Sequence, residues 1–261
     1  HNTDHLSKVA IVESAGKNVK LFRPGDEVVG DLSGCGFGGF ADFALATEKA
    51  LVHKPAGLSF EMAAALPMAS MTALQALRNK GQIQKGQEVC ILGSSGGVGT
   101  IAIQLARHFG AVITAVCSTQ NVEQSQLLGA DRVIDYSKED FAVGNRKYDL
   151  IIAVNGNYSL LKCRKALKPD GRYVLVGGAL SQIFKAIVIG KPLSLGRKKM
   201  LFLAAKTDTN DLRYLLGLAS DGIIKPVIEK YFSPETTAEA MKYAAGGHAR
   251  GKVVIKWNPE A

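Results

Sequence analysis

A glycine-dense turn, residues 92–99, stands between an apolar run and a helical pattern, and it constrains the fold more than any other segment. The apolar run, Glu88 to Leu92, predicts a short buried strand, and Thr100 to Phe109 predicts a helix that Gly110 ends. A strand, a tight glycine turn and a helix in this order place a diphosphate at the helix N-terminus. There the free backbone N–H groups and the positive end of the helix dipole favour an anion.

The glycines of this turn have separate tasks. Gly93 allows the chain to leave the strand sharply, and Gly99 allows the helix to pack closely against the strand. Gly96 and Gly97 lack a Cβ, so phosphate oxygens can approach the main chain there. The alternative is an ordinary turn, but the flanking strand and helix favour a nucleotide site. The residues expected to contact the cofactor here are Gly93, Ser95, Gly96, Gly97, Val98 and Gly99.

Apolar strands alternate with helical patterns through the centre of the chain, which is typical of a parallel sheet covered on both faces. We expect the strand order 3-2-1-4-5-6, with ligands at the carboxyl ends of the strands. The expected strands are residues 88–92, 111–116, 132–136, 149–154, 172–176 and 199–205; helices are expected at 100–109, 122–128 and 158–167, and a turn at 168–171.

The end of the second strand indicates which dinucleotide binds. In folds of this type it meets the adenosine ribose, where an acidic residue favours NAD and repels the extra phosphate of NADP. Here Ser118, Thr119 and Gln120 follow the strand, and the first acidic residue is Glu123 on the next helix. Hydroxyl and amide donors suit a phosphate, so we predict NADP(H), with Tyr136 after the third strand as a further donor. The alternative is that Ser118 and Thr119 only cap the following helix.

Composition bounds the remaining possibilities. A net charge of +9 over 261 residues is interpreted as a solvated basic face near an anionic cofactor. No nucleic-acid-binding motif accompanies this charge, so nucleic acid is not expected as a partner. No apolar run reaches about 18 residues, so we expect no membrane span. The four cysteines lack a CxxC spacing and are interpreted as small thiols, buried in the core at Cys90 and Cys117, in a reducing compartment.

The first sixty residues differ from the centre of the chain and predict a small β-rich unit. Residues 9–16 and 24–30 combine strand and turn signals, and residues 37–46 predict another strand. Ser59 is a candidate N-cap for the helical pattern that follows. The end of the chain, with an amphipathic segment at 234–245, is expected to return to this β-rich unit.

Motifs spread over nearly the whole chain resemble those of the medium-chain dehydrogenase/reductase superfamily, in its zinc-independent quinone oxidoreductase-like branch. They are GDEV at 25–28, GFADF at 39–43, PMASMTA at 67–73, GSSGGVG at 93–99, LGAD at 128–131, VIDY at 133–136 and GKVV at 251–254. The resemblance implies an α/β fold, a Rossmann-type doubly wound parallel sheet plus a partial GroES-like β domain. The implied domains are the partial GroES-like catalytic domain at 1–68, the NADP-binding domain at 69–223, and a return to the catalytic domain at 224–261.

The resemblance also implies which residues surround the nicotinamide. Thr72 would hold the nicotinamide end, with an ordinary helix hydroxyl as the alternative, and Lys252 would lie near the cofactor cleft. The last strand, residues 201–205, would join two copies in a homodimer. No general acid is identifiable, so catalytic residues stay unassigned. The remaining residues implied to line this region are Asn155, Gly177, Gly178, Phe202 and Leu203.

Two departures from the family accompany the resemblance. The family's chains begin well before the position of Val9, so we expect the amino-terminal part of the catalytic domain to be missing here. Gln120 stands where NADP-binding relatives often carry an arginine. We expect a cytoplasmic protein, with organelle targeting left open because the start is interpreted as incomplete.

Zinc is not expected. Zinc-dependent members of the superfamily carry a four-cysteine lobe where residues 29–39 stand, and this segment holds only Cys35, whereas a structural zinc site needs four ligands. Those members also place a cysteine ligand of the catalytic zinc near residues 66–70, where this chain has none. The candidate histidines, interpreted as surface or helix-face residues without ligand spacing, are His53, His108 and His248.

Without a strong Lewis acid, conjugated acceptors are the implied substrates. A quinone or an α,β-unsaturated carbonyl takes hydride from nicotinamide C4 and delocalises the charge onto oxygen. Two alternatives stay open: a catalytically weak cofactor- or RNA-binding regulator on the same fold, and a zinc alcohol dehydrogenase relative. Oxidation of NADPH by quinones or enones separates the leading hypothesis from the regulator.

Overall fold

The computed structural model describes residues 7–36, 38–143, 145–154, 158–177, 194, 196–247 and 249–257. The chain forms two compact units: unit 1 contains His1–Met71 and Lys206–Ala261, and unit 2 contains Thr72–Ala205. The domain boundaries expected at residues 68 and 223 differ from this division chiefly in helix α7 (Thr209–Ser220), which belongs to unit 1.

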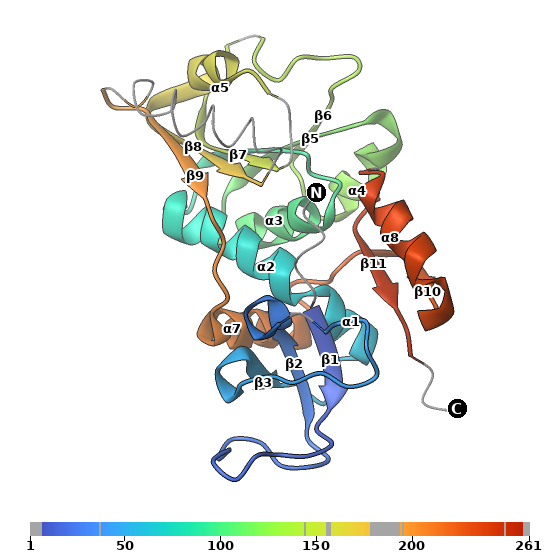
Figure 1. The fold of residues 1–261 in the computed structure, drawn as a ribbon. Coiled ribbons are helices and arrows are strands. Elements are labelled where there is room, and N and C mark those ends of the chain that lie inside the picture. The colour runs from blue at the N-terminus through green and yellow to red at the C-terminus, as the bar shows by residue number, and fades with distance from the viewer. Residues whose placement is uncertain are drawn as a thin grey trace. The chain divides into compact units, whose positions relative to one another are not determined.

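Six parallel strands form the sheet of unit 2 (Figure 1). Their order, β6-β5-β4-β7-β8-β9, confirms the expected 3-2-1-4-5-6 arrangement. From β4 the successive strands β5 and β6 are added on one side, and from β7 the strands β8 and β9 are added on the other side. In folds of this type, ligands bind beyond the carboxyl ends of the two strands where the order reverses, here β4 and β7. The strands are β4 (Glu88–Leu92), β5 (Val112–Cys117), β6 (Arg132–Asp135), β7 (Tyr148–Val154), β8 (Leu167–Val176) and β9 (Lys199–Leu203).

Helices connect these strands. Helix α3 (Gly97–His108) begins inside the glycine turn, earlier than the expected Thr100, and Arg107 in its last turn suits the negative end of the helix dipole. The Ser159 hydroxyl accepts the N–H of Lys162 and so begins α5 (Leu160–Ala166). The other helical elements are α2 (Pro67–Leu74), the π-helical η3 (Gln75–Lys80), η4 (Thr119–Asn121) and α4 (Val122–Leu127).

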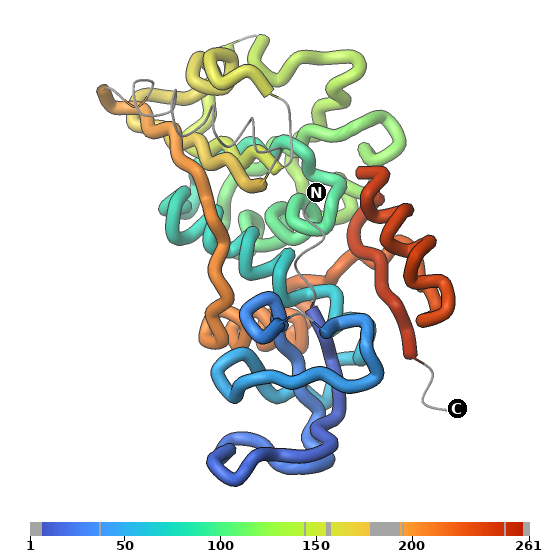
Figure 2. Tube along the Cα trace, viewed as in Figure 1, coloured from blue at the N-terminus to red at the C-terminus, as the bar shows by residue number. Residues whose placement is uncertain are grey.

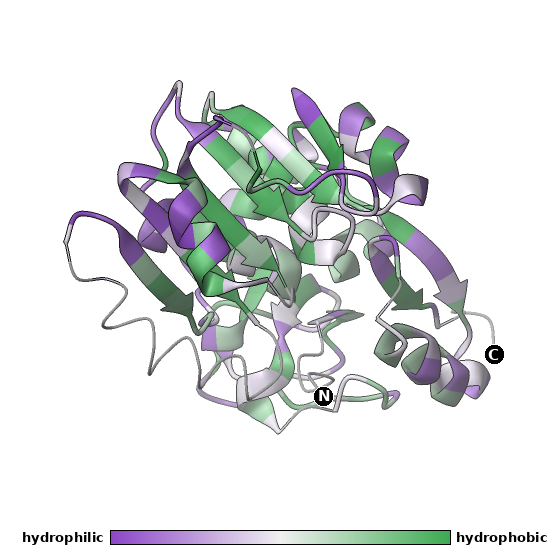
Figure 3. Ribbon diagram, turned by 90° about the horizontal axis from the view of Figure 1, so that it is seen from above, coloured by the Kyte–Doolittle hydropathy of each residue, from purple (hydrophilic) through white to green (hydrophobic). Residues whose placement is uncertain are grey.

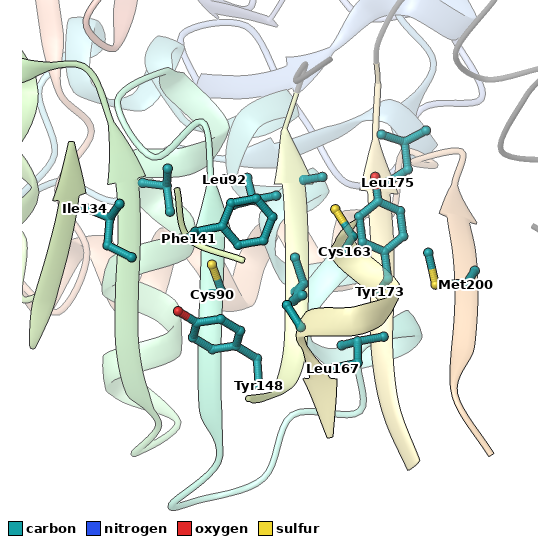
Figure 4. Packing of buried hydrophobic residues seen from close by; sticks show 14 residues of the cluster. Cys90, Leu92, Ile134, Phe141, Tyr148, Cys163, Leu167, Tyr173, Leu175 and Met200 are labelled. Carbon is teal, nitrogen blue, oxygen red and sulfur yellow. The ribbon is translucent and has the colours of Figure 1, made fainter. Parts of the chain in front are cut away.

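Both faces of this sheet are buried. Ile151 and Ile152 of β7 point to opposite faces, and both are fully buried. Figure 3 shows that hydrophobic residues dominate the strands of the sheet, whereas the helices carry both hydrophobic and hydrophilic residues. On one face, Cys163 of α5 packs into a cluster that also holds Cys90 and Tyr148 (Figure 4). This burial explains why the strands are near-continuous apolar runs.

The cysteines are free thiols, and Cys90, Cys117 and Cys163 are buried whereas Cys35 is half-buried. Burial of Cys90 and Cys117 in the core was predicted and is confirmed. Desolvation raises the pKa of Cys163 to about 12 and raises the pKa of Cys90 well above its ordinary value. Since the thiolate is the reactive form, these buried thiols are packing residues and not nucleophiles.

Residues Lys168–Gly171, expected as a turn, belong to β8 instead. The ladder pairs Leu167 with Tyr148 and resumes with Arg172 opposite Leu150, so the intervening residues bulge outward. Within this bulge a turn-forming residue, Asp170, takes a φ of 65°. The turn-forming residues therefore bend the backbone locally, but β8 pairs with β7 before and after them, so they remain part of one strand.

The strand predicted at residues 37–46 is wrong, because the described residues 38–46 form turns and bends. Gly38 has a φ of 66°, which lies outside the strand region. Phe43 and Leu45 are 74% and 90% exposed, so the apolar residues of this segment bury no common face. Strands are stable when they pair and bury a face, and this segment pairs with none of the described strands.

Unit 1 contains an antiparallel sheet of order β1-β2-β3 and a parallel pair, β10 and β11. The Ser59 hydroxyl accepts the N–H of Met62 at 3.2 Å, which confirms Ser59 as the N-cap of α1. Helix α8 lies beside β11, and both belong to the C-terminal part of the chain (Figure 2). The elements are β1 (Ser7–Ile11), β2 (Glu27–Asp31), η1 (Leu32–Cys35), η2 (Glu48–Ala50), β3 (Leu51–His53), α1 (Phe60–Ala65), β10 (Ile228–Phe232), η5 (Pro234–Thr236), α8 (Thr237–Ala245) and β11 (Lys252–Ile255).

Across the ranges that the structure describes, no helix combines the length and apolar character needed to cross a bilayer.

Candidate functional site

The turn after β4 depends on two positions where a side chain cannot fit. Gly93 has a φ of 76°, and a Cβ built there would lie 2.4 Å from the carbonyl oxygen of Val154. A Cβ built on Gly99 would lie 2.3 Å from the carbonyl oxygen of Gly93. The predicted structural tasks of Gly93 and Gly99 are therefore confirmed: one bends the chain, and the other brings α3 against the turn.

The N-terminus of α3 is open to an anion. Gly96 is its N-cap residue, and no side chain of the described residues caps the helix there. No described atom outside its immediate neighbours lies within 4 Å of where a Gly96 Cβ would stand, and the first turn holds no acidic residue. Gly97 and Val98 are half-buried beside it. The first N–H groups of α3 and the positive end of its dipole thus suit a phosphate.

Ser94 anchors this turn to the neighbouring strand. Its backbone N–H and its hydroxyl both donate to the carbonyl oxygen of Val116, at 3.1 and 3.2 Å, and the side chain is fully buried. Its hydroxyl also lies 3.1 Å from that of Ser125. Ser94 is therefore structural, whereas the adjacent Ser95, predicted to contact the cofactor, is half-buried and its carbonyl accepts the side-chain amide of Gln124 at 3.5 Å.

Residues predicted near the nicotinamide lie along the same carboxyl edge of the sheet. Val176 at the end of β8 is opposite both Val154 of β7 and Leu203 of β9. Gly177 follows directly, with a φ of 66°, and Phe202 is half-buried one position before Leu203. The register of unit 2 thus brings Gly177, Phe202 and Leu203 to the edge at which the glycine turn stands.

Residues predicted to meet the ribose phosphate follow β5 and β6, which are neighbouring strands. The Ser118 hydroxyl accepts the side-chain amide of Asn121 at 2.8 Å and makes no cap to η4. Thr119 and Gln120 are exposed, and Tyr136 is 58% exposed. The capping alternative is therefore not supported for Ser118, and its hydroxyl proton is left for another acceptor.

Asp135, at the end of β6, lies in the same corner of unit 2, which is formed by the residues at and after the ends of β5 and β6. It was not predicted as a site residue from the sequence. The parallel ladder pairs Asp135 with Cys117, the last residue of β5. Its carboxylate accepts the hydroxyl of Thr119 at 2.6 Å and the hydroxyl of Ser137 at 2.7 Å. These hydrogen bonds hold the pKa of Asp135 down to about 2, so it is ionised at neutral pH. The expected pairing of β5 with β6, the next strand along the chain, is the signal that could have found it.

Lys138 supplies a cation to the same corner. Its ammonium lies 3.5 Å from Asp135 Oδ2, and its side chain is 71% exposed. It stands two residues after Tyr136, just beyond the VIDY motif. A single exposed ion pair contributes little stability, which leaves the ammonium available to a ligand.

Other predicted residues stand elsewhere. Thr72 is buried in α2, where unit 2 begins. Lys252 opens β11 in unit 1, and desolvation lowers its pKa. Asn155 and Gly178 lie outside the described residues.

No group of three histidine, cysteine or acidic side chains suited to a metal occurs among the residues that the structure describes. The His53 ring packs against Phe22 and lies 3.2 Å from the carbonyl oxygen of Leu21. The His108 ring packs at a tilt against Phe109 at the end of α3. His248 lies outside the described residues.

Comparisons with known proteins find similar sequences and structures among oxidoreductases. A family model described as a zinc-binding dehydrogenase matches residues 128–255. The chloroplast envelope quinone oxidoreductase homolog of Arabidopsis thaliana is 32% identical over 254 residues, which are 94% of this chain and 77% of that protein. The chloroplastic NADPH-dependent alkenal/one oxidoreductase of Arabidopsis thaliana is 32% identical over 256 residues, 94% of this chain and 61% of that protein. The solved quinone oxidoreductase from Coxiella burnetii has a TM-score of 0.84 and 29% identity, covering 97% of this chain and 78% of that chain.

The two kinds of glycine in the turn should respond differently to alanine. Gly99→Ala should destabilise the protein by about 2 kcal/mol, because its methyl group must displace the backbone of the turn. Gly96→Ala should cost less than about 1 kcal/mol, because the space beside Gly96 is open. Thermal unfolding of both variants measures the difference, and equal midpoints would contradict the close packing at Gly99.

Proposed function

This chain belongs to the quinone oxidoreductase-like branch of the medium-chain dehydrogenase/reductase superfamily, and we propose that it transfers hydride from NADPH to a quinone or an α,β-unsaturated carbonyl without zinc. Oxidoreductase activity on such acceptors agrees with the names of its relatives. The observation that carries the proposal is the uncapped N-terminus of α3 beside Gly96, at the centre of the sheet's carboxyl edge.

The residues present fit a dinucleotide. A diphosphate would accept hydrogen bonds from the first N–H groups of α3, and Gly96 offers the close approach that this requires. The adenosine ribose would lie at the ends of β5 and β6, near Ser118 and Tyr136. The nicotinamide would lie toward the ends of β7, β8 and β9, where Gly177 and Phe202 stand.

When bound, the nicotinamide would supply a hydride from C4 to the β-carbon of an enone or to a quinone, and the charge that develops on oxygen would be neutralised by a proton from solvent or a weak donor. The task of the protein would be to position the acceptor against the nicotinamide. Thr72 and Leu203 are proposed to line this region on the resemblance alone. No described side chain is assigned as a proton donor.

Zinc independence is proposed from the sequence of this chain. The segment at residues 29–39 holds one cysteine, and residues 66–70 hold none, so the ligand sets of zinc-dependent members are absent from both places. Conjugated acceptors need less polarisation than simple carbonyls, because the added charge delocalises. The names of the relatives favour an enzyme with turnover over the alternative of a regulator.

NADP(H) is the proposed form of the cofactor. The Ser118 hydroxyl retains its proton, the Tyr136 phenol is exposed, and Lys138 adds a cation at the same corner. These groups suit the charge and the acceptor oxygens of a phosphate. A relative whose name specifies NADPH supports the same choice.

A reducing compartment, the cytoplasm or an organelle, is proposed for the protein. Cysteines that are buried and free suit such a compartment. The similarity to proteins named chloroplastic keeps an organelle among the options.

Activity tests the proposal directly. Oxidation of NADPH, followed by the absorbance of the reduced nicotinamide, should occur with quinones or enones and persist after treatment with a chelator. Gly96→Ala should remain folded but bind both nucleotides about tenfold more weakly, which corresponds to about 1.4 kcal/mol, because its methyl group occupies the approach of the diphosphate. Stoichiometric zinc, or absence of turnover with every acceptor class, would contradict the proposal.

Cofactor choice is tested by fluorescence titration. NADPH should bind about tenfold more tightly than NADH, and Lys138→Gln should weaken NADPH alone by about fivefold, because only NADPH carries the 2′-phosphate. Lys168→Gln removes an equivalent charge that pairs with Asp149 near the start of β7, at the opposite edge of the sheet, and it should change neither affinity. Equal dissociation constants for the two nucleotides would remove the proposal of NADP(H).

A homodimer through β9 is proposed, because β9 is an edge strand that pairs only with β8 among the described strands. Edge strands expose N–H and C=O groups that a second copy can pair. Sedimentation velocity at micromolar concentration should give twice the 27.7 kDa of one chain, with slowed amide exchange at residues 199–203. A monomer under these conditions would contradict it.

A further inference from the structure

In a dinucleotide site of this fold, the Asp135 carboxylate would lie beside the adenosine ribose, where NADP carries a 2′-phosphate and NAD does not. The end of β5 meets the adenosine ribose in this kind of sheet, and no acidic residue follows β5 directly. Asp135 reaches the same place from the neighbouring strand, because it lies opposite Cys117 in the parallel ladder. Its side chain is only 10% exposed, so its position is set by the surrounding groups.

The hydrogen bonds of Asp135 use the donors that a phosphate would need. Thr119 donates its hydroxyl proton to Asp135 Oδ2 at 2.6 Å, and Ser137 donates to Oδ1 at 2.7 Å. The backbone N–H of Ser137 donates to the same Oδ1 at 3.0 Å. A hydroxyl has one proton, so Thr119 and Ser137 present only acceptor lone pairs to a ligand.

Asp135 also lowers the positive charge of the corner. Lys138 lies 3.5 Å from Oδ2, so its ammonium is shared between the carboxylate and any incoming anion. An ionised carboxylate near a dianionic phosphate is unfavourable, whereas a neutral ribose hydroxyl can donate to an oxygen lone pair without such a penalty.

We propose that Asp135 is a specificity-determining residue that limits the preference of this protein for NADPH over NADH. It does so by accepting the protons of Thr119 and Ser137, by pairing with Lys138 and by its own charge. This inference rests on the proposed function, since it assigns a role within the same cofactor site.

Asp135→Asn tests the proposal. The amide keeps the size of the side chain, but its single oxygen can accept from only one of Thr119 and Ser137, so the other hydroxyl regains its proton. The substitution also removes the charge and releases Lys138. The ratio of the NADH to the NADPH dissociation constant should rise by about fivefold, the size of an exposed charge–charge interaction. The rise should come from tighter NADPH, with NADH affinity nearly unchanged.

Asp131→Asn is the matched control. Asp131 stands immediately before β6, at the opposite end of the strand, where its carboxylate accepts the N–H of Ile113 at 2.7 Å. The substitution makes the same change in net charge about 13 Å away along the strand. The ratio should stay at its wild-type value, which separates a local effect of Asp135 from a general effect of charge.

Thr119→Val is a second, independent measurement should Asp135→Asn fail to fold. If the hydroxyl of Thr119 serves Asp135, its loss should not weaken NADPH binding selectively. A selective loss of NADPH affinity in Thr119→Val would show that Thr119 donates to the phosphate, and this would overturn the proposal.

The other outcomes are also decisive. An unchanged ratio in folded Asp135→Asn would overturn the role of Asp135 while leaving the cofactor site in place. Absence of binding of either nucleotide to the unaltered protein would instead defeat the proposed function, so the two failures are distinguishable.

Discussion

The contact between Gly99 and the backbone of Gly93 is the constraint on which the rest of unit 2 depends. With no side chain between them, α3 begins directly against the end of β4. That closeness directs the first N–H groups of the helix toward the carboxyl edge of the sheet, where parallel strands converge. Gly93 and Ser94 then tie the turn to β5 through three hydrogen bonds to the carbonyl oxygen of Val116, which hold the helix N-terminus in place.

The sequence predicted this part of the molecule well because the signals are local. Near-continuous apolar runs such as β4 and β7 mark strands buried on both faces, and the order of the six strands follows from alternation with helices. The same local rules were wrong at residues 37–46, where apolar residues such as Phe43 alternate but bury no face. They were also incomplete at Lys168–Gly171, where a turn sequence lies inside a paired strand.

The corner formed by the residues at and after the ends of β5 and β6 could be predicted only in part, because the residues that meet there depend on which strands pair. Ser118 and Thr119 are found by reading along β5, but Asp135 reaches them from β6 through the ladder. The hydroxyl of Thr119 was interpreted as a donor to a ligand, and its proton is committed to Asp135 instead. Residue type alone does not say whether a hydroxyl still has a proton to give.

In the proposed site, the glycine turn with α3 would set the affinity for both nucleotides, and the residues at the ends of β5 and β6 would set the preference between them. Main-chain groups of α3 would bind what NADH and NADPH share, so alteration of the glycine turn would affect both nucleotides alike. Side chains after β5 and β6 would meet what distinguishes the two nucleotides, and they are exposed or linked by polar hydrogen bonds rather than packed in the core. Substitutions at Asp135 or Lys138 should therefore change the degree of preference between the two nucleotides more than they change the packing of the sheet, since neither side chain is part of its hydrophobic core.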